Sequence, residues 1–207
     1  MPNHCDNRLT ITGDKEELKR FVSKTHKGGN DYNFNELVPL DPRASKEVRW
    51  AKEDGTEQVF SAFSNAEDGF DGYQNALDVW GSKWGAYDIQ PNGAWHEVLD
   101  KEDYHDITFN YQSAWSPARG LIQRISAQFP TLAFGVWYTE EGMGFAGWEL
   151  YKSGEEISEN SISLNNLPEY DWDDDASMEK HDQAMEEVYE ALESALHEAT
   201  MEVMVGQ

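Results

Sequence analysis

The N-terminal residues alternate between apolar and polar positions and then switch to a helical period. Within the segment RLTITG, Leu9 and Ile11 fall on one face, which predicts a short strand. Asp14 then offers an N-cap, and the apolar residues after it recur every three or four positions. The sequence therefore predicts a strand followed by a helix that ends at the next Gly-Gly pair.

The same pattern returns in the second half of the chain. His105 to Gln112 alternates strictly, and Ser116-Pro117 supplies an N-cap and a first-turn proline for a helix that continues to Phe129. Two further strands, over 132–139 and 145–152, are joined by a Gly-rich turn and predict a hairpin. Weaker signals lie between the two halves: a strand over 58–63, a helix over 76–84 and a strand over 87–90.

The order of these elements predicts a fold class. Strand, helix, insertion, strand, strand, helix, strand and strand is close to the split βαβ pattern, which is typical of an α+β fold with a ferredoxin-like antiparallel sheet. We expect residues 1–155 to form this domain, with the insertion at about 30–85. Residues 156–207 are then an acidic linker and an appended long C-terminal helix, predicted over 177–204, that packs on the domain or extends it. Residues 157–167 are predicted as strand or loop.

Short motifs follow one another along residues 2–150. They are Pro2-Asn3-His4, Asn7 to Gly13, Leu37 to Leu40, Trp80 to Trp84, Ala114 to Pro117, Phe129-Pro130, Tyr138, Glu140 to Gly142, Phe145 and Gly147. In this order they resemble the YubB-type ferredoxin-like proteins of plasmids and phages, although Ser82 and Ala118 stand where that family has Thr and Pro. The resemblance implies the same fold and an accessory protein of a mobile element that works in the bacterial cytoplasm. It implies no particular activity.

The predicted C-terminal helix carries an apolar stripe at heptad-like spacing. The stripe consists of Met178, His181, Met185, Val188, Leu192, Ala195 and Ala199, and it is widened by Tyr189, Leu196 and Val203. A widened stripe suits packing on the protein's own sheet, whereas a narrow one suits a dimer seam. We expect docking on the sheet, with a homodimer as the alternative.

Charge changes this picture most in the last third of the chain. The protein has 40 acidic and 16 basic residues, a net charge of −24, and residues 131–207 hold 19 of the acids but only two of the bases. Such a surface disfavours nucleic acid or anionic lipid as a direct partner, because both require positive charge. It favours a basic protein as the partner, or simple solubility.

Carboxylates on the C-terminal helix recur on successive turns, about 5.4 Å apart along the axis. Like charges at this spacing repel, so a rigid acidic row of this kind suggests imitation of a nucleic-acid backbone, although a solvated acidic face is the simpler alternative. The predicted partner-binding residues are Asp173, Asp174, Asp175, Glu179, Asp182, Glu186, Glu187, Glu190, Glu193 and Glu198.

Other chemistry has little support in the sequence. Cys5 is the one cysteine, so a disulfide, a cysteine zinc site and an iron–sulfur cluster are not expected. An EF-hand-like run begins at Asp171, but Ala176 and Asp182 stand where Gly and Glu are required, so no metal or cofactor is expected. No apolar run is long enough to span a membrane, and no secretory signal is recognised.

These observations lead to one functional hypothesis and two alternatives. We expect a non-enzymatic module whose acidic face binds and inhibits a basic, nucleic-acid-handling host protein, such as a nuclease, a DNA-modifying enzyme or another defence component. One alternative is an assembly module that forms a homo-oligomer through the C-terminal helix. The other is a small-ligand binder with a pocket near Trp80, Trp84 and Trp115, between the Trp-rich insertion and the sheet.

Overall fold

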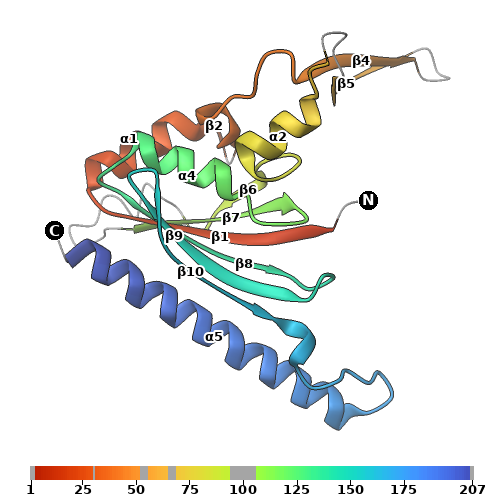
Figure 1. Ribbon diagram of the computed structural model, residues 1–207, viewed down its shortest axis with the longest axis vertical. Coiled ribbons are helices and arrows are strands. Elements are labelled where there is room, and N and C mark those ends of the chain that lie inside the picture. The colour runs from red at the N-terminus through yellow and green to blue at the C-terminus, as the bar shows by residue number, and fades with distance from the viewer. Residues whose placement is uncertain (1–2, 30, 52–55, 65–68, 94–105, 206–207) are drawn as a thin grey trace.

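The computed structural model describes residues 3–29, 31–51, 56–64, 69–93 and 106–205. One large sheet runs through the molecule, with helices on both of its faces (Figure 1). The strands are β1 (His4–Thr12), β2 (His26–Gly28), β3 (Asp31–Tyr32), β4 (Ser45–Ala51), β5 (Glu57–Phe63), β6 (Tyr87–Pro91), β7 (Asp106–Ala114), β8 (Ala133–Glu140), β9 (Phe145–Lys152) and β10 (Glu155–Ser163). The helices are α1 (Lys15–Thr25), α2 (Gly72–Trp80), α4 (Arg119–Gln128) and α5 (Asp175–Val205), with short 3₁₀ turns η1 (Asn35–Leu37) and η2 (Leu164–Asn166).

The main sheet has the strand order β10-β9-β8-β1-β7-β6, and its paired neighbours are antiparallel. The first βαβ unit consists of β1, α1 and β6, and β7 lies between its two strands. The second unit consists of β7, α4 and β8, and β1 lies between its two strands. That arrangement is the split βαβ topology, so the predicted α+β, ferredoxin-like fold is confirmed. Strands β9 and β10 extend the sheet beyond the four-stranded unit.

The sheet continues past the boundary that we expected at residue 155. Strand β10 begins at Glu155 and pairs with β9 along its length, with a register shift between Glu156 and Ser158. The segment predicted as strand or loop is therefore mostly strand, followed by η2. The part of the chain that serves as linker shortens to the residues between η2 and α5.

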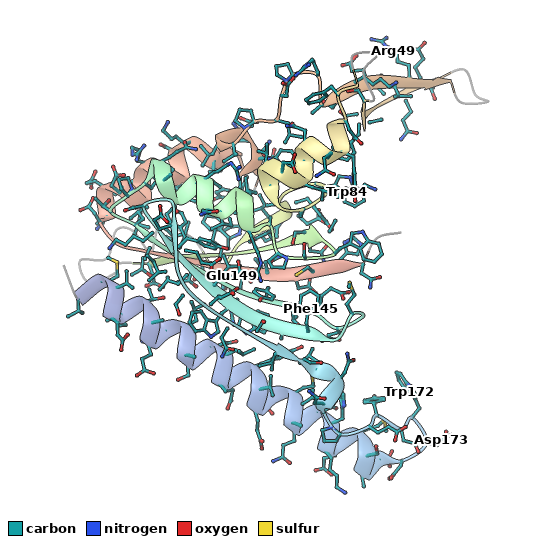
Figure 2. All side chains as sticks on the ribbon, in the orientation of Figure 1. Arg49, Trp84, Phe145, Glu149, Trp172 and Asp173 are labelled. Carbon is teal, nitrogen blue, oxygen red and sulfur yellow. The ribbon has the colours of Figure 1, made fainter. Side chains whose placement is uncertain are left out.

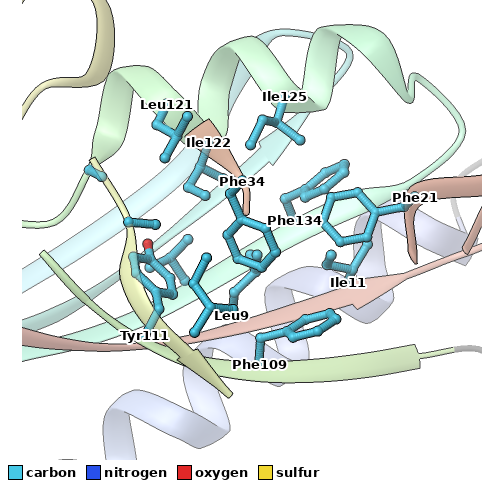
Figure 3. Close-up of a cluster of buried hydrophobic side chains, with 14 of the residues drawn as sticks. Leu9, Ile11, Phe21, Phe34, Phe109, Tyr111, Leu121, Ile122, Ile125 and Phe134 are labelled. Atoms are coloured by element: carbon cyan, nitrogen blue, oxygen red, sulfur yellow. The ribbon is translucent and has the colours of Figure 1, made fainter. Parts of the chain in front are cut away.

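Helices α1 and α4 cover one face of the sheet and enclose the larger core. Phe21 of α1 packs against four other rings, with centroid distances from 5.4 to 6.1 Å. Figure 3 labels Phe34, Phe109 and Phe134 among them. These partners come from a loop, from β7, from the end of α4 and from β8: Phe34, Phe109, Phe129 and Phe134. The inward positions of the predicted strands therefore form this core, as the alternation required.

The predicted start of one helix is confirmed, and the predicted boundaries of two other helices are wrong. The Asp14 side chain accepts a hydrogen bond from the Glu17 amide at 3.0 Å, so the predicted N-cap of α1 is confirmed. Helix α4 starts at Arg119, later than predicted, because the Ser116 carbonyl is engaged by the Ser113 hydroxyl at 2.7 Å and the Ser116 side chain does not cap the helix. The second difference is at α2.

Helix α2 was predicted over 76–84 but spans Gly72–Trp80. Gly81 adopts φ 75°, a left-handed conformation that ends the helix after Trp80. Trp84 consequently lies outside the helix. The β4–β5 hairpin, which belongs to the insertion, projects away from the body of the molecule (Figure 1).

Helix α5 covers part of the opposite face of the sheet, over β8 and β9. Leu192, Leu196 and Thr200 are buried there, and the two leucines pack in a second core with Trp148 and Leu150 of β9. The close approach depends on Gly135 of β8, where a Cβ would lie 3.0 Å from a Leu196 methyl carbon. From Met185 to Val203 the apolar stripe of α5 therefore docks on the protein's own sheet, as expected, whereas Met178 and His181 lie outside this core.

We predict that Leu196→Ala lowers the free energy of unfolding by about 2–4 kcal/mol, because it removes a buried side chain and leaves a cavity against the sheet. Urea denaturation followed by tryptophan fluorescence measures the change, since Trp148 belongs to the same core. Val205→Ala, at an exposed position on the same helix, is the control and should change stability little. Equal effects of the two substitutions would contradict the docking of α5.

Candidate functional site

All ten acidic residues that were predicted to bind a partner are exposed, on α5 or on the loop that precedes it. Because α5 buries its apolar stripe against the sheet, its charged side chains project outward or along its flanks (Figure 2). The structure divides them by position. Asp182, Glu186, Glu190 and Glu193 line cavities between one flank of α5 and its surroundings.

The other six selected residues, Asp173, Asp174, Asp175, Glu179, Glu187 and Glu198, line none of these three cavities. Two of them help to start the helix instead. The Asp174 side chain accepts a hydrogen bond from the Ala176 amide at 3.0 Å, and Asp175 adds negative charge to the first turn of α5.

Three neighbouring cavities form one groove along this flank of α5. Their volumes are about 500, 520 and 700 Å³. Glu193 lines all three of them, Arg8 and Trp137 line the first two, and Tyr189 lines the last two. Shared lining residues make the cavities continuous, and we call them together the α5 groove.

The floor of the α5 groove is the face of β1 and β7 that α5 leaves uncovered. Thr10 faces its register partner Thr108, and their hydroxyl oxygens are 3.3 Å apart. Asn110 and Gln112 continue this polar row, and Gln112 donates a hydrogen bond to Asp6 at 2.9 Å. Residues that alternate with the core positions of a strand point to the opposite face, so the floor is polar for the same reason that the core is apolar.

The lining of the α5 groove is strongly acidic. Counted over the residues that the structure describes, it holds eight carboxylates and one guanidinium, that of Arg8. Arg8 forms an ion pair with Glu193 and lies over the Trp137 ring, 5.2 Å from the ring centroid. Its positive charge is therefore already used within the protein, and the groove presents a net negative potential.

Two aromatic rings contact each other in the middle of the groove. The Trp137 and Tyr189 rings meet edge to face, with centroids 5.1 Å apart. The Tyr189 hydroxyl lies 3.0 Å from the Thr139 hydroxyl and donates to Glu141 at 3.3 Å. Partial burial raises the pKa of Tyr189, so its hydroxyl stays protonated at neutral pH and remains a donor.

A second polar cluster lies on the other face of the sheet, beneath α4. Glu149 of β9 is fully buried and accepts a hydrogen bond from Tyr151 at 2.6 Å. Arg119 of α4 lies 2.7 Å from the other Glu149 oxygen, and it also binds Glu159 of β10 at 2.9 Å and Tyr138 at 3.3 Å. The cluster therefore ties α4 to β9 and β10.

Burial dominates the electrostatics of this cluster. It raises the pKa of Glu149 from its ordinary 4.5 to about 7, although Tyr151 and Arg119 oppose the shift, and it raises the pKa of Tyr138 to about 12. Within the described part of the chain, the Glu149 oxygen next to Arg119 has an ion-pair contact but no aligned hydrogen bond. A buried carboxyl with a pKa near neutrality is typical of functional sites, but Glu149 lines none of the four cavities described.

Sequence reasoning missed both Glu149 and the groove. The signal for Glu149 was present in the strand FAGWELYK, where the one acid shares a face of the strand with the aromatic residues Phe145 and Tyr151. No signal pointed to the groove, because Arg8 and Glu193 are 185 positions apart in the sequence.

The three tryptophans predicted to line a pocket occupy separate environments. Trp80 packs against the main core and donates to the Val38 carbonyl at 2.7 Å. Trp84 is 37% exposed beside Tyr87, and Trp115 is 44% exposed at a turn with φ 70°. None of the four cavities described includes any of them.

Over the described residues, no group of three or more His, Cys, Asp or Glu side chains is arranged to hold a metal ion. No helix in the described part of the chain combines the length and apolar character needed to cross a bilayer.

We predict that Glu149 makes stability fall as pH rises. Its pKa is higher in the folded protein than in the unfolded chain, so the folded state binds more protons between pH 4.5 and about 7 and loses this advantage above that window. Relative to Glu149→Gln, the wild type should lose about 2 kcal/mol of unfolding free energy between about pH 5.5 and pH 8. Urea denaturation at several pH values measures this difference, and parallel curves for the two proteins would show that the carboxyl keeps its ordinary pKa.

Comparisons with known proteins support the fold. Residues 94–190 match the family model of the ferredoxin-like domain in Api92-like protein. The crystal structure of a protein api92 from Yersinia pseudotuberculosis is similar to this chain with a TM-score of 0.50 and 12% sequence identity, covering 79% of this chain and 99% of that chain. No curated protein matches the sequence.

The family match overlaps the motif-bearing region 2–150 over residues 94–150 and does not include residues 2–93. It continues to residue 190 and so includes β10 and the first half of α5. The helix that forms one wall of the groove therefore lies partly inside the matched region. Residues 94–190 are similar to the ferredoxin-like domain of Api92-like proteins, and the chain as a whole has the ferredoxin-like fold.

Proposed function

We propose that this protein is a non-enzymatic accessory protein of a plasmid or phage, related to the YubB-type proteins, that binds a basic protein through the α5 groove. The partner class is a nucleic-acid-handling host protein in the bacterial cytoplasm, such as a nuclease, a DNA-modifying enzyme or another defence component. Binding would inhibit the partner by occupying the surface that its nucleic acid needs. The acidic flank of α5 thus takes the place of a nucleic-acid backbone.

One observation supports this proposal above the others. Among the described residues, the lining of the groove has eight carboxylates and a single guanidinium, which is already paired with Glu193. A fixed concave surface of one sign attracts an oppositely charged partner and speeds the encounter. Docking on β8 and β9 holds α5 in place, so its carboxylates are presented without ordering a free helix on binding.

The same docking bears on the assembly alternative. The apolar stripe of α5 is occupied by Trp148, Leu150 and their neighbours on the sheet. A homodimer through this stripe would have to displace those contacts. We therefore favour heterologous binding through the flank of α5 over self-association through its buried face.

We predict that reversing the charge of Asp182, Glu186 and Glu190 to Lys abolishes partner binding, because all three line the groove and none holds the fold together. The matched control reverses Glu187, Glu198 and Glu202, which are equally exposed on α5 but line no described part of the groove. With about 100° per residue, these three fall on the far side of the helix. Glu193 is left unchanged, so that Arg8 keeps its partner.

The measurement is affinity capture from host lysate at about 50 mM and about 500 mM NaCl, followed by identification and activity assay of the captured protein. We expect a basic, nucleic-acid-handling protein to be retained at low salt by the wild type and by the control. It should be released by competing DNA, and its activity should be inhibited by the wild type. Capture that is equal for both triple variants, or a captured protein with no basic surface, would refute the proposal.

A further inference from the structure

The far end of the α5 groove differs from the rest in being rich in aromatic rings. This end is the cavity of about 700 Å³, and we call it the aromatic pocket. Its aromatic residues are Tyr170 and Trp172 from the loop before α5, and His181 and Tyr189 from α5 itself. The turn between β8 and β9 closes it on another side through Glu141.

Trp172 is the most unusual side chain of the pocket, because 79% of its surface is exposed (Figure 2). The ring is not isolated, since it meets Tyr170 edge to face with centroids 4.7 Å apart. Tyr170 meets His181 in the same way at 5.1 Å. A large aromatic ring that stands in solvent beside a cavity is a typical anchor point for a partner.

The loop that carries Trp172 is fixed at several points. The Ser177 hydroxyl donates to the Glu169 carbonyl at 2.6 Å, and His181 Nδ1 donates to the Pro168 carbonyl at 2.8 Å. The Asp171 side chain accepts from the Asp173 amide at 3.0 Å. These bonds hold the backbone on both sides of Trp172, so little conformational freedom remains to be lost when a ligand binds.

The charge of the pocket selects the kind of ligand. Glu141, Asp182, Glu186, Glu190 and Glu193 line the same cavity as the rings, and no lysine or arginine from the described ranges does so. Carboxylates exclude an anionic ligand, and ring faces attract a cation that lies within about 6 Å of their centroids. An arginine side chain satisfies both, because its planar guanidinium can stack on a ring and bind a carboxylate through two parallel hydrogen bonds.

We propose that the aromatic pocket binds an arginine side chain of the basic partner, with the guanidinium between the Trp172 ring and the carboxylates of α5. This inference rests on the proposed function and refines it, because it names the chemical group that the far end of the groove recognises. Trp172 is the hot spot of the surface, and the remainder of the α5 groove supplies long-range attraction.

The test uses the full chain and two probes, a hexaarginine peptide and a hexalysine peptide, in isothermal titration and tryptophan fluorescence. We expect the wild type to bind hexaarginine more tightly than hexalysine, with a change in fluorescence. Trp172→Ala should weaken hexaarginine binding about tenfold or more and remove that change, whereas Trp172→Phe should retain much of the affinity. Trp84→Ala, at another exposed tryptophan outside the groove, is the matched control and should bind like the wild type.

The outcomes separate this inference from the proposed function. Unchanged hexaarginine binding by Trp172→Ala would overturn the pocket, and so would equal affinity for the two peptides. If the Asp182, Glu186 and Glu190 reversal still abolishes capture of the partner, the proposed function survives that result. If the reversal and Trp172→Ala both leave binding unchanged, the inference and the proposed function fail together.

Discussion

The packing of α5 on β8 and β9 determines what the rest of the surface can do. A helix is about 10 Å across and strands lie about 4.8 Å apart, so one helix covers about two strands of a sheet. Helix α5 covers β8 and β9, which lie on one side of β1, and leaves the polar side of β1 and β7 uncovered beside it. The groove is the direct result, since it has the flank of the helix as its wall and the uncovered strands as its floor. Without this contact the carboxylates of α5 would belong to a free helix with no fixed relation to the sheet.

The contact also explains how the protein tolerates so many like charges. Repulsion between carboxylates on successive turns costs a few tenths of a kcal/mol per pair, whereas each fully buried leucine contributes about 1.5–3 kcal/mol. Leu192 and Leu196 alone therefore outweigh much of the repulsion along the helix. The Arg8–Glu193 ion pair and the Trp137–Tyr189 contact add a polar and an aromatic connection on the groove side. The acidic row is thus compatible with a stable helix, because the apolar side chains on the other face of α5 stabilise it by packing on the sheet.

Features that depend on local sequence could be predicted, and features that depend on rotation or register could not. Alternation located β1 and β7, and Asp14 marked the start of α1, because a strand or a cap is defined by residues a few positions apart. The stripe of α5 predicted docking, but the choice between its two flanks depends on how the helix is turned on the sheet. The rotation of α5 about its own axis is fixed by the contact of Leu196 with Gly135, and these two residues are 61 positions apart in the sequence. The ten acids therefore looked equivalent in the sequence, although four of them line the groove. The burial of Glu149 was readable from its place in the strand, whereas its partner Arg119 was not, because α4 is placed over β9 only by the tertiary fold.

The two polar clusters illustrate opposite uses of charge in one sheet. Glu149 is desolvated beneath α4, and its pKa rises to about 7 because burial penalises its charged form more than Tyr151 and Arg119 favour it. The carboxylates that α5 contributes to the groove are exposed to water. A buried carboxyl such as Glu149 affects the free energy of unfolding, whereas an exposed carboxyl remains accessible to a partner. The proposed recognition therefore depends on the exposed acidic flank of α5, whereas the buried cluster acts within the fold.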